Sequence, residues 1–482
     1  MMSRTNPSAA DLGAIDLSAV VKAYDVRGVV PDQWGPQEAR ALGAATVEIL
    51  QLRAPGRPMA LGYDMRPSSP ELVEAFGDGV RDRGVDVVVI GLCSTDGLYY
   101  ASGVLDCAGA MFTASHNPAQ YNGIKLCRAG AKPVGQDTGL DAIRQQAEQY
   151  LLDGVPVLPE RGGRSEQDLL VGYAQHLRAL VDVSGGRRLT VVVDAGNGMG
   201  GHTVPAVLGV AAGLPALPLD VVDLYFELDG TFPNHEANPL EPENLRDLQA
   251  AVLEHGADLG LAFDGDADRC FVVDERGQPV SPSAVTALVA LREIAKEHEA
   301  GREPLIIHNL ITSAVVPELV AAAGGTALRT RVGHSFIKQE MADSGAVFGG
   351  EHSAHYYFRD FWGADTGMLA ALHVIAALQG SSGTLSDLVG SYEKYSASGE
   401  INSRVEDVPA AVARVRSAFA GRGSVDELDG MTVIGTDEGP MWWFNLRASN
   451  TEPLLRLNVE AVDTPTMEAL RDEVLALARK ES

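Results

Sequence analysis

Short apolar segments alternate with amphipathic segments along most of this chain, and this alternation is the feature that most restricts its fold. The apolar segments are rich in branched side chains, which is typical of buried strands. They are Met59–Asp64, Val85–Leu92, Leu189–Asp194, Asp258–Phe263 and Leu305–His308. Between them, helical periodicity predicts helices at Gln37–Leu52, Leu72–Arg83, Asn244–His255 and Ala284–His298. Such alternation predicts an α/β architecture with largely parallel or mixed sheets.

The chain is long enough for several domains, because a single hydrophobic core stops growing beyond about 250–300 residues. Gly- and Pro-rich segments near residues 160, 280 and 390 predict boundaries. We therefore expect domains at 1–160, 161–279, 280–392 and 393–482. The first three look like variations on one α/β unit. The last has a different pattern, which predicts a small α+β domain from Pro409–Phe419, Met431–Ile434, Met441–Leu446, Leu454–Val459 and Met467–Arg479.

Charge and hydropathy exclude several kinds of partner. The formal net charge is −27 at pH 7, and no cluster of Lys and Arg offers a surface for nucleic acid or an anionic membrane. No stretch approaches the roughly 18 apolar residues of a membrane span, and the N-terminus carries no apolar export signal. The four cysteines lack C-x-x-C spacing and lie in or beside apolar runs. We expect them to be buried free thiols, which favours the cytoplasm.

A serine lies in a segment that could carry chemistry, Thr113–Pro118. The run Gly109–Phe112 predicts the end of a strand, and the Asn-Pro pair after His116 predicts a turn. Ser115 is therefore expected on an exposed loop at the carboxyl end of a strand, where α/β sheets bind ligands. It could act as a nucleophile, or it could only bond the backbone of a turn. Lys125 could supply charge to a phosphoryl group or be a solvated lysine.

The segment Asp264–Arg269 follows a predicted apolar strand and has an aspartate at every second position. The carboxylates of Asp264, Asp266 and Asp268 repel one another unless a cation lies among them, and a set of oxygen ligands suits Mg²⁺. A calcium-binding EF-hand loop is a competing interpretation, but its sixth position requires glycine and here holds Arg269. A solvated acidic turn is the other alternative. If Ser115 carried a phosphate, its oxygens could complete a metal site.

A glycine-rich segment suggests a different function. Gly196–Gly201 follows a predicted strand, precedes a helical stretch and matches the G-x-G-x-x-G pattern of dinucleotide-binding folds. It is therefore the basis of an alternative hypothesis, a nucleotide-dependent oxidoreductase. Close packing at a strand-to-helix turn also explains such glycines.

Several other polar loops hold residue types that bind phosphate or sugar hydroxyls. Guanidinium groups grip phosphate, whereas a group of Glu, Ser and His reads hydroxyls or performs acid–base chemistry. Each loop also has an ordinary interpretation, such as a surface ion pair or a turn cap. These loops are Ala23–Gly28, Gly62–Arg66, Gly333–Lys338, Gly350–His355 and Arg447–Pro453.

Taken together and in this order, the motifs resemble one family, the α-D-phosphohexomutases. The matching pieces extend over nearly the whole chain and are Ala23–Gly28, Thr113–Pro118, Asp264–Arg269, Gly333–Lys338, Gly350–His355 and Arg447–Pro453. The resemblance implies three consecutive mixed α/β domains of similar topology and a C-terminal α+β domain related to the TATA-binding protein, around a central cleft. By the same resemblance, the four domains carry in turn a phosphoserine loop, a metal loop, a sugar-binding loop and a phosphate-binding loop.

The resemblance also implies residue roles. Ser115 would be the phosphoserine, and its oxygens would join Asp264, Asp266 and Asp268 around Mg²⁺. Phosphoryl transfer would be assisted by Arg27, Lys125 and Arg269. The histidines His116, His334 and His355 match positions in the cleft, but which group is the acid or base stays open. The implied substrate-binding residues are Tyr24, Glu351, Ser353, His355, Arg447, Ser449, Asn450 and Thr451.

The implied reaction interconverts a hexose 1-phosphate and a hexose 6-phosphate through a 1,6-bisphosphate, which also serves as activator. The expected partners are small sugar phosphates, with the chain a monomer or homodimer. Gly350–His355 departs from the Gly-Glu-Met-Ser-Gly-His form of dual-specificity members, and His308–Ser313 lacks a lysine that some members have there. We expect mannose as the preferred sugar, with phosphoglucomutase and phosphoglucosamine mutase activities as the alternatives.

Overall fold

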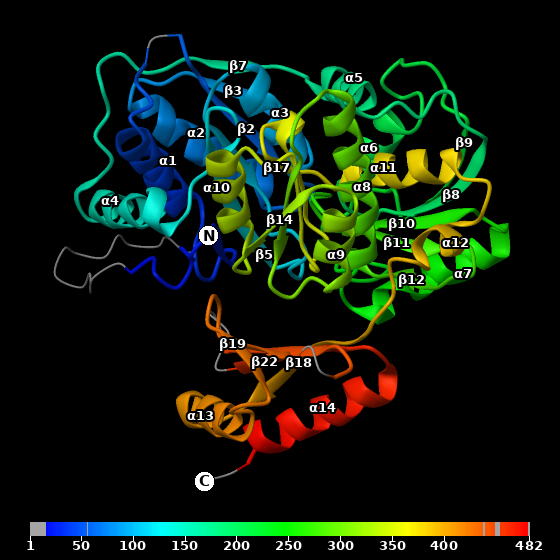
Figure 1. Ribbon diagram of the computed structural model, residues 1–482. Coiled ribbons are helices and arrows are strands. Elements are labelled where there is room, and N and C mark those ends of the chain that lie inside the picture. The colour runs from blue at the N-terminus through cyan, green and yellow to red at the C-terminus, as the bar shows by residue number, and fades with distance from the viewer. Residues whose placement is uncertain (1–15, 55, 437–438, 449–453, 481–482) are drawn as a thin grey trace. The chain divides into compact units, whose positions relative to one another are not determined.

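The computed structural model describes residues 16–54, 56–436, 439–448 and 454–480, and Figure 1 labels the helices and strands along the chain. The chain divides into two compact units. The first unit comprises Met1–Pro279 and Tyr357–Ser382, and the second comprises Val280–Tyr356 and Gly383–Ser482. No helix in the described part of the chain is both long and apolar enough to cross a membrane.

The N-terminal sheet of the first unit is mixed. Its strands are β1 (Val26–Val29), β2 (Met59–Tyr63), β3 (Val87–Leu92), β4 (Gly109–Phe112), β5 (Tyr121–Arg128), β6 (Lys132–Pro133) and β7 (Arg164–Glu166). They follow the order β1-β5-β4-β2-β3-β7, with β6 paired to β5. The central strands β4, β2, β3 and β7 are parallel, whereas β5 is antiparallel to both β4 and β1.

Helices cover both faces of this sheet. They are α1 (Pro36–Leu50), α2 (Ser69–Asp82), α3 (Thr95–Val104) and α4 (Leu140–Asp153), and a short 3₁₀ turn η1 (Gln136–Thr138) precedes α4. In β2, Met59 and Leu61 pack into the core shared with α1, α2 and α4, whereas Ala60 packs into the core beside α3. Successive strand residues point to opposite faces, so a strand buried on both faces is apolar throughout. This burial explains why β2 and β3 were recognisable as continuous apolar runs.

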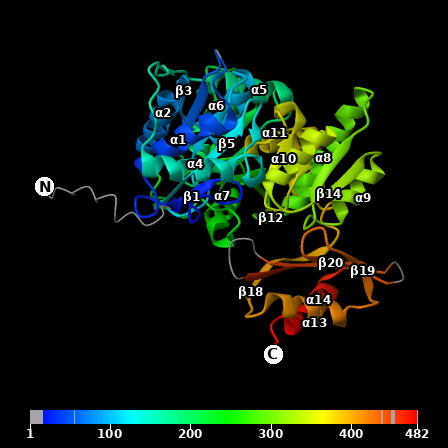
Figure 2. The ribbon, with the colours of Figure 1, turned by 90° about the vertical axis from the view of Figure 1, so that its left-hand side faces the viewer.

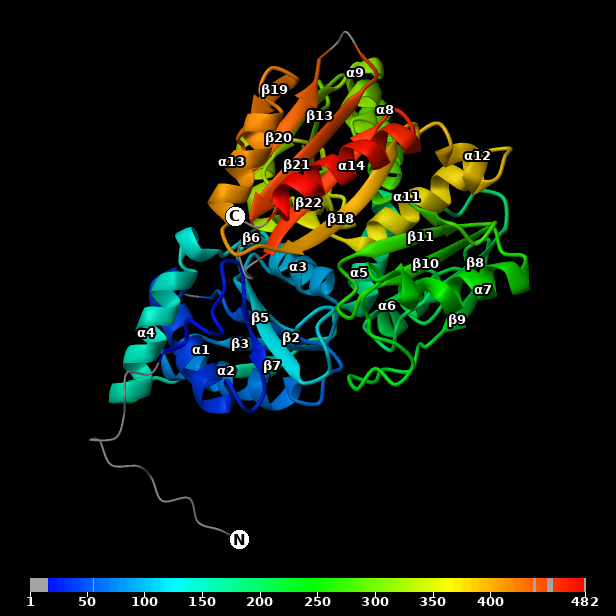
Figure 3. The same ribbon diagram turned by 90° about the horizontal axis from the view of Figure 1, so that it is seen from below.

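The second sheet of the first unit is also mixed, and Figure 3 shows its strands side by side with α7 next to them. The strands are β8 (Leu189–Asp194), β9 (Leu219–Leu224), β10 (Leu259–Phe263) and β11 (Cys270–Asp274). β8 runs parallel to β9 and β10, and β11 closes an antiparallel hairpin with β10. The accompanying helices are α5 (Leu170–Leu180), α6 (Gly200–Val207), η2 (Pro242–Leu245), α7 (Arg246–His255) and α11 (Gly367–Gly380).

The glycine-rich turn after β8 packs against the loop that follows β10. A Cβ atom on Gly198 would lie 2.8 Å from the carbonyl oxygen of Gly265, and one on Gly201 would lie 2.2 Å from that of Phe226. Both positions therefore exclude a side chain. These contacts support the packing interpretation of Gly196–Gly201 over the dinucleotide interpretation.

The second unit begins within β12 (Pro279–Val280) and contains the parallel strands of a mixed sheet, which lie around β13 (Leu305–Asn309). β14 (Thr326–Thr330) and β15 (Phe348–Gly350) flank β13. Its helices are α8 (Pro282–Glu299), α9 (Val315–Ala322), α10 (His334–Ser344) and α12 (Leu385–Val389), and Figure 2 shows α8 and α9 beside β14. The chain returns to the first unit within β16 (Tyr356–Phe358), continues through η3 (Arg359–Phe361), and there β16 pairs with β17 (Ala364–Asp365).

The C-terminal part of the second unit is an antiparallel sheet with two helices on one face (Figures 1 and 2). Its strands are β18 (Ser396–Arg404), β19 (Gly423–Asp426), β20 (Met431–Gly435), β21 (Trp442–Ala448) and β22 (Leu454–Ala461), and its helices are α13 (Val408–Ala418) and α14 (Thr464–Ala478). The strand order is β18-β22-β21-β20-β19. Apolar side chains of both helices and of the sheet form one core.

The predicted fold class is confirmed, since mixed α/β sheets precede an antiparallel α+β domain. The three boundaries between the four predicted domains, at 160, 279 and 392, stay predictions. The four cysteines are buried and free, as predicted.

Candidate active site

Ser115 lies in a tight turn that begins directly after β4. Its backbone adopts a left-handed conformation with φ 49°, which is uncommon for a residue other than glycine and marks functional sites more often than ordinary turns. The Ser115 amide donates to Oγ1 of Thr113 at 2.9 Å, and the Asn117 amide donates to the carbonyl of Ala114 at 3.0 Å. The prediction of an exposed loop is wrong at this residue, because Ser115 is only 4% exposed.

Arg66 explains why the turn is buried and fixed. Its guanidinium lies 2.7–2.9 Å from four backbone carbonyl oxygens of the serine segment, those of Ser115, Asn117, Pro118 and Tyr121. A fifth interaction joins Nε to Asp64 at 3.2 Å. The sequence suggested a phosphate-binding role for this arginine, but its donors are committed to the turn. It positions Ser115.

The three aspartates lie in the hairpin between β10 and β11, and this loop contacts the serine turn. Asp264, Asp266 and Asp268 are at most 1% exposed. The Ser115 hydroxyl donates to Oδ2 of Asp264 at 2.7 Å, across 149 residues of sequence. A Cβ atom on Gly265 would lie only 2.4 Å from the Ser115 carbonyl oxygen, so this approach requires glycine. The two motifs therefore form one site within the first unit.

Two cations compensate the buried carboxylates. Nζ of Lys125 lies 2.7 Å from Oδ2 of Asp266 and 2.6 Å from Oδ2 of Asp268, and Arg269 donates from Nε to Asp264 at 2.9 Å. Burial raises the pKa of Asp264 despite the neighbouring Arg269. Burial also acts to raise the pKa of Asp266, but Lys125 outweighs it and holds that pKa well below its usual value. The site thus holds its carboxylates in a dry environment, where Lys125 keeps Asp266 charged.

The carboxylates fit a divalent cation. One oxygen from each of Asp264, Asp266 and Asp268 lies within 4.8 Å of the others. Oδ1 of Asp266 is buried and has no hydrogen-bond partner among the described residues. An orphaned buried carboxylate oxygen is costly, and a hard cation with oxygen ligands would remove that cost.

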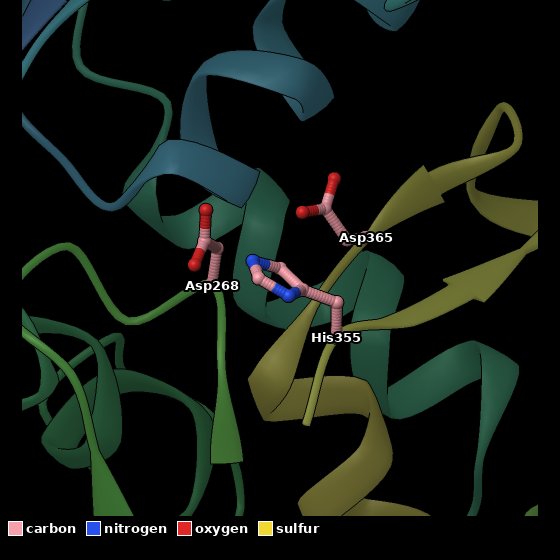
Figure 4. Close-up of side chains that lie close together, drawn as sticks. All are labelled: Asp268, His355 and Asp365. Atoms are coloured by element: carbon pink, nitrogen blue, oxygen red, sulfur yellow. The ribbon is translucent and has the colours of Figure 1, made fainter. Parts of the chain in front are cut away.

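Asp365 is a further acidic residue that the sequence analysis missed. One of its carboxylate oxygens lies within 4.8 Å of an oxygen of Asp268. Figure 4 draws both, with Asp268 ahead of β11 and Asp365 in β17, together with His355 of the second unit. β17 lies about 100 residues beyond the metal loop in sequence and has only two residues, so neither spacing nor hydropathy could indicate it.

His116 stays neutral beside Ser115. Nη2 of Arg269 lies 2.6 Å from Nδ1 of His116, and the Ser115 hydroxyl lies 3.2 Å from the same nitrogen. An arginine only donates, so Nδ1 is the acceptor and the ring proton resides on Nε2. Burial, together with the charges of Arg269 and Arg27, lowers the pKa of His116 well below its usual value. Nδ1 is thus available as a hydrogen-bond acceptor at neutral pH.

Arg27 and Tyr24 lie at the edge of this site. Arg27 in β1 donates from Nη1 to Oδ1 of Asn117 at 2.7 Å and pairs with Asp25. Its side chain is 21% exposed. Tyr24 is partly buried just before β1. Arg27 therefore contacts the serine turn while remaining accessible.

The second unit holds the predicted sugar-binding loop after β15. Glu351 is 2% exposed, and its Oε1 accepts from Asn309 at 3.1 Å. The Ser353 hydroxyl lies 3.0 Å from Nδ1 of His355. His334 begins α10, but its side chain lies outside what the structure describes. The loop thus gathers Glu351, Ser353 and His355.

The predicted phosphate-binding segment begins with Arg447, near the end of β21. Arg447 is buried and donates to Oε2 of Glu400 at 2.6 Å. Its Nη1 is also buried and lacks a hydrogen-bond partner within the described residues. Glu400 also pairs with Arg456 at 3.1 Å. Ser449, Asn450 and Thr451 lie outside the described residues.

Comparison with known proteins identifies the family. Four consecutive models of phosphoglucomutase/phosphomannomutase domains match the chain. They are alpha/beta/alpha domain I at residues 18–152, domain II at 171–277, domain III at 282–395 and the C-terminal domain at 400–477.

Whole-chain relatives agree with the domain models. The protein named phosphohexose mutases from Xanthomonas campestris pv. campestris is 42% identical over 462 residues, which cover 95% of this chain and 98% of the relative. A phosphomannomutase of Salmonella montevideo is 42% identical over 463 residues with the same coverage. The crystal structure of a phosphoglucomutase/phosphomannomutase family protein from Burkholderia thailandensis superposes with a TM-score of 0.83 at 29% identity, covering 96% of this chain and 98% of that one. The chain belongs to the phosphoglucomutase/phosphomannomutase family.

Proposed function

We propose that this hexose phosphate mutase acts on mannose phosphates and that Ser115 carries the phosphate it transfers. The observation that carries the proposal is the hydrogen bond from the Ser115 hydroxyl to Asp264 at 2.7 Å. That bond places a strained serine next to three buried carboxylates, and Arg269 and His116 lie beside it. An ordinary turn serine would need none of these neighbours.

The proposed reaction moves one phosphoryl group in each of two steps. In the first step, the bond between Oγ of phosphorylated Ser115 and phosphorus breaks while a hydroxyl oxygen of the hexose phosphate forms a new bond to phosphorus, and the proton that this hydroxyl loses ends on Oγ of Ser115. In the second step, Oγ of Ser115 loses its proton and bonds to the phosphorus of the other phosphate of the resulting 1,6-bisphosphate, while the bond from that phosphorus to the sugar oxygen breaks and the sugar oxygen regains a proton. Lys125 and Arg269 offset negative charge on the phosphoryl group during its transfer, and Arg27 offers further hydrogen-bond donors at the edge of the site. Free hexose 1,6-bisphosphate, acting as activator, would restore enzyme that has lost its phosphate.

Mg²⁺ is the proposed cation. Asp264, Asp266 and Asp268 would hold it together with an oxygen on Ser115, because a set of oxygen ligands suits this ion. When bound, it would neutralise charge on the phosphoryl oxygens. The orphaned Oδ1 of Asp266 supports this assignment.

The second unit supplies the proposed recognition of the rest of the substrate. Glu351, Ser353 and His355 offer acceptors and donors for sugar hydroxyls. The buried and unsatisfied Nη1 of Arg447 supports a role in holding the phosphate that is not transferred. Roles for Tyr24, His334, Ser449, Asn450 and Thr451 rest on the family resemblance.

The preference for mannose rests on relatives, because the Salmonella protein is named a phosphomannomutase. The Xanthomonas name, phosphohexose mutases, keeps glucose and glucosamine phosphates as alternatives. The test compares kcat/KM for mannose, glucose and glucosamine 1-phosphates on one preparation, with Mg²⁺ and a trace of bisphosphate. We expect the highest value for mannose 1-phosphate. A higher value for either other sugar would refute the preference while leaving the mutase reaction intact.

A further inference from the structure

We infer that Thr95, the first residue of α3, is a positioning residue that fixes the orientation of the Asp266 carboxylate, so that one of its oxygens is left for a divalent cation. The inference rests on the metal site of the proposed function. It concerns a residue outside all the motifs that carry the family resemblance.

Thr95 holds Asp266 through both backbone and side chain. Its hydroxyl donates to Oδ2 of Asp266 at 2.6 Å, and its amide donates to the Asp266 carbonyl at 3.0 Å. Both residues are fully buried and lie 171 positions apart in sequence. The amide bond fixes the Asp266 backbone, and the hydroxyl bond fixes the rotation of its carboxylate.

The two oxygens of Asp266 are consequently different. Oδ2 accepts from Thr95 at 2.6 Å and from Lys125 at 2.7 Å, so both donors converge on one oxygen. Oδ1 is buried without a partner among the residues described. The two oxygens of a carboxylate are equivalent, so a half-turn restores the same arrangement, whereas any smaller rotation would draw the accepting oxygen away from Thr95 and Lys125. Oδ1 is therefore the oxygen left for a cation.

A buried network holds Thr95 itself in place. Asp96, the next residue, accepts from the hydroxyls of Tyr173 at 2.7 Å and Thr366 at 2.6 Å, and also from Ser94. The Ser94 hydroxyl in turn caps α3 by accepting from the Gly97 amide at 3.2 Å. These bonds connect α3 to α5 and to the start of α11, and none of them involves the proposed metal ligands. Thr95 is thus a fixed donor, whether or not a cation is bound.

The test removes only the hydroxyl. Thr95→Val keeps the shape of the side chain, so Mg²⁺ binding, measured by calorimetry on enzyme freed of metal, isolates the loss of the hydrogen bond. Removal of a group that orients a metal ligand typically weakens affinity by about 10–100-fold, and we expect the Kd for Mg²⁺ to rise by at least about tenfold. Thr95→Ser restores the hydroxyl and should recover affinity close to that of the original chain.

The matched control is Thr46→Val. Thr46 is also fully buried, but its hydroxyl donates to the Leu42 carbonyl within α1 at 2.8 Å, remote from the metal loop. Its removal should leave the Kd for Mg²⁺ unchanged. If Thr95→Val fails to fold, Thr95→Ala removes the same hydroxyl without adding volume and takes its place.

The outcomes separate this inference from the proposed function. Unchanged Mg²⁺ affinity in Thr95→Val, with affinity lost in Asp266→Asn, would overturn the role of Thr95 and leave the metal site standing. Failure of the unmodified enzyme to bind Mg²⁺ would overturn both.

Discussion

The residues around Ser115 compensate the negative charge of the buried aspartates. Three buried carboxylates would repel one another, yet each has a cation or a hydroxyl donor in contact. Lys125 bridges two of them and is itself only 13% exposed. In a dry site, removing one partner of such a pair costs far more than the pair contributes at a surface.

We predict that Lys125→Met destabilises the first unit in the absence of Mg²⁺. The substitution leaves Asp266 and Asp268 without their shared cation. We expect the free energy of unfolding to fall by about 3 kcal/mol, which corresponds to a fall in Tm of about 5–10 °C. Calorimetry of the metal-free enzyme measures it. Added Mg²⁺ should restore part of the loss. Lys132→Met, at an exposed lysine, is the control; an equal fall in Tm for both variants would contradict the prediction.

Residue types and spacing singled out Ser115 and the three aspartates, which the structure brings together, whereas their roles stay predictions. Residue types and spacing were insufficient for Arg66, Thr95 and Asp365, because nothing local distinguishes an arginine on four buried carbonyls from one at a surface. The contacts of Arg66 and Thr95 extend over 49 to 55 and 171 residues of sequence respectively. Only the assembled fold brings these partners together.

Among the elements, strand ends and helix starts build the site. β4 and β10 end at the serine and aspartate loops, and α3 begins at Thr95 against the latter. Such strands were predictable because both faces are buried, as for β8, whose bounds agree with the prediction. β18 was missed because Ser396–Arg404 is mostly polar and exposed and shows no apolar alternation.

We predict that Asp96, which connects α3, α5 and α11, makes the folding stability of the first unit depend on pH. Burial raises the pKa of Asp96 to about 6, from 3.8 in the unfolded chain. The folded state therefore binds more protons than the unfolded state between these values. Stability from this group is present below pH 3.8 and is lost as the pH rises through about 6.

Asp96→Asn cannot ionise and should escape that loss. The free energy of unfolding of Asp96→Asn, relative to that of the unmodified enzyme, should be greater at pH 7.5 than at pH 5 by about 1.4 kcal/mol. Thermal melts at the two pH values measure this difference. A Tm difference that is the same at both would show that Asp96 does not titrate in this window.

Across the whole molecule, local cations must overcome a net charge of −27 to bind an anionic sugar phosphate. The first unit places Lys125, Arg269 and Arg27 around the serine turn, and the second unit places Arg447 and Arg456 on neighbouring strands. The chain passes between the units three times. The residues proposed for phosphoryl transfer and those proposed to hold the second phosphate therefore belong to different units.

We predict that Arg447→Met raises KM for the hexose phosphate by about 10–100-fold, the value of one or two charged hydrogen bonds. The fraction of enzyme phosphorylated at Ser115 should not change, because Arg447 belongs to the other unit. Steady-state kinetics and intact mass provide the two readouts. Arg416→Met, which removes an exposed arginine paired with Glu427, should change neither. A loss of phosphorylation in Arg447→Met would contradict the division of roles.

The proposal that Ser115 carries the phosphate is tested by the intact mass of the enzyme after incubation with hexose 1,6-bisphosphate. We expect a species heavier by about 80 Da, the mass of one added phosphoryl group, in the unmodified enzyme and in the control Ser165→Ala. Ser115→Ala should lack that species and lose nearly all turnover. A Ser115→Ala enzyme that is still phosphorylated and still interconverts the hexose phosphates would contradict the role of Ser115 as the phosphate carrier.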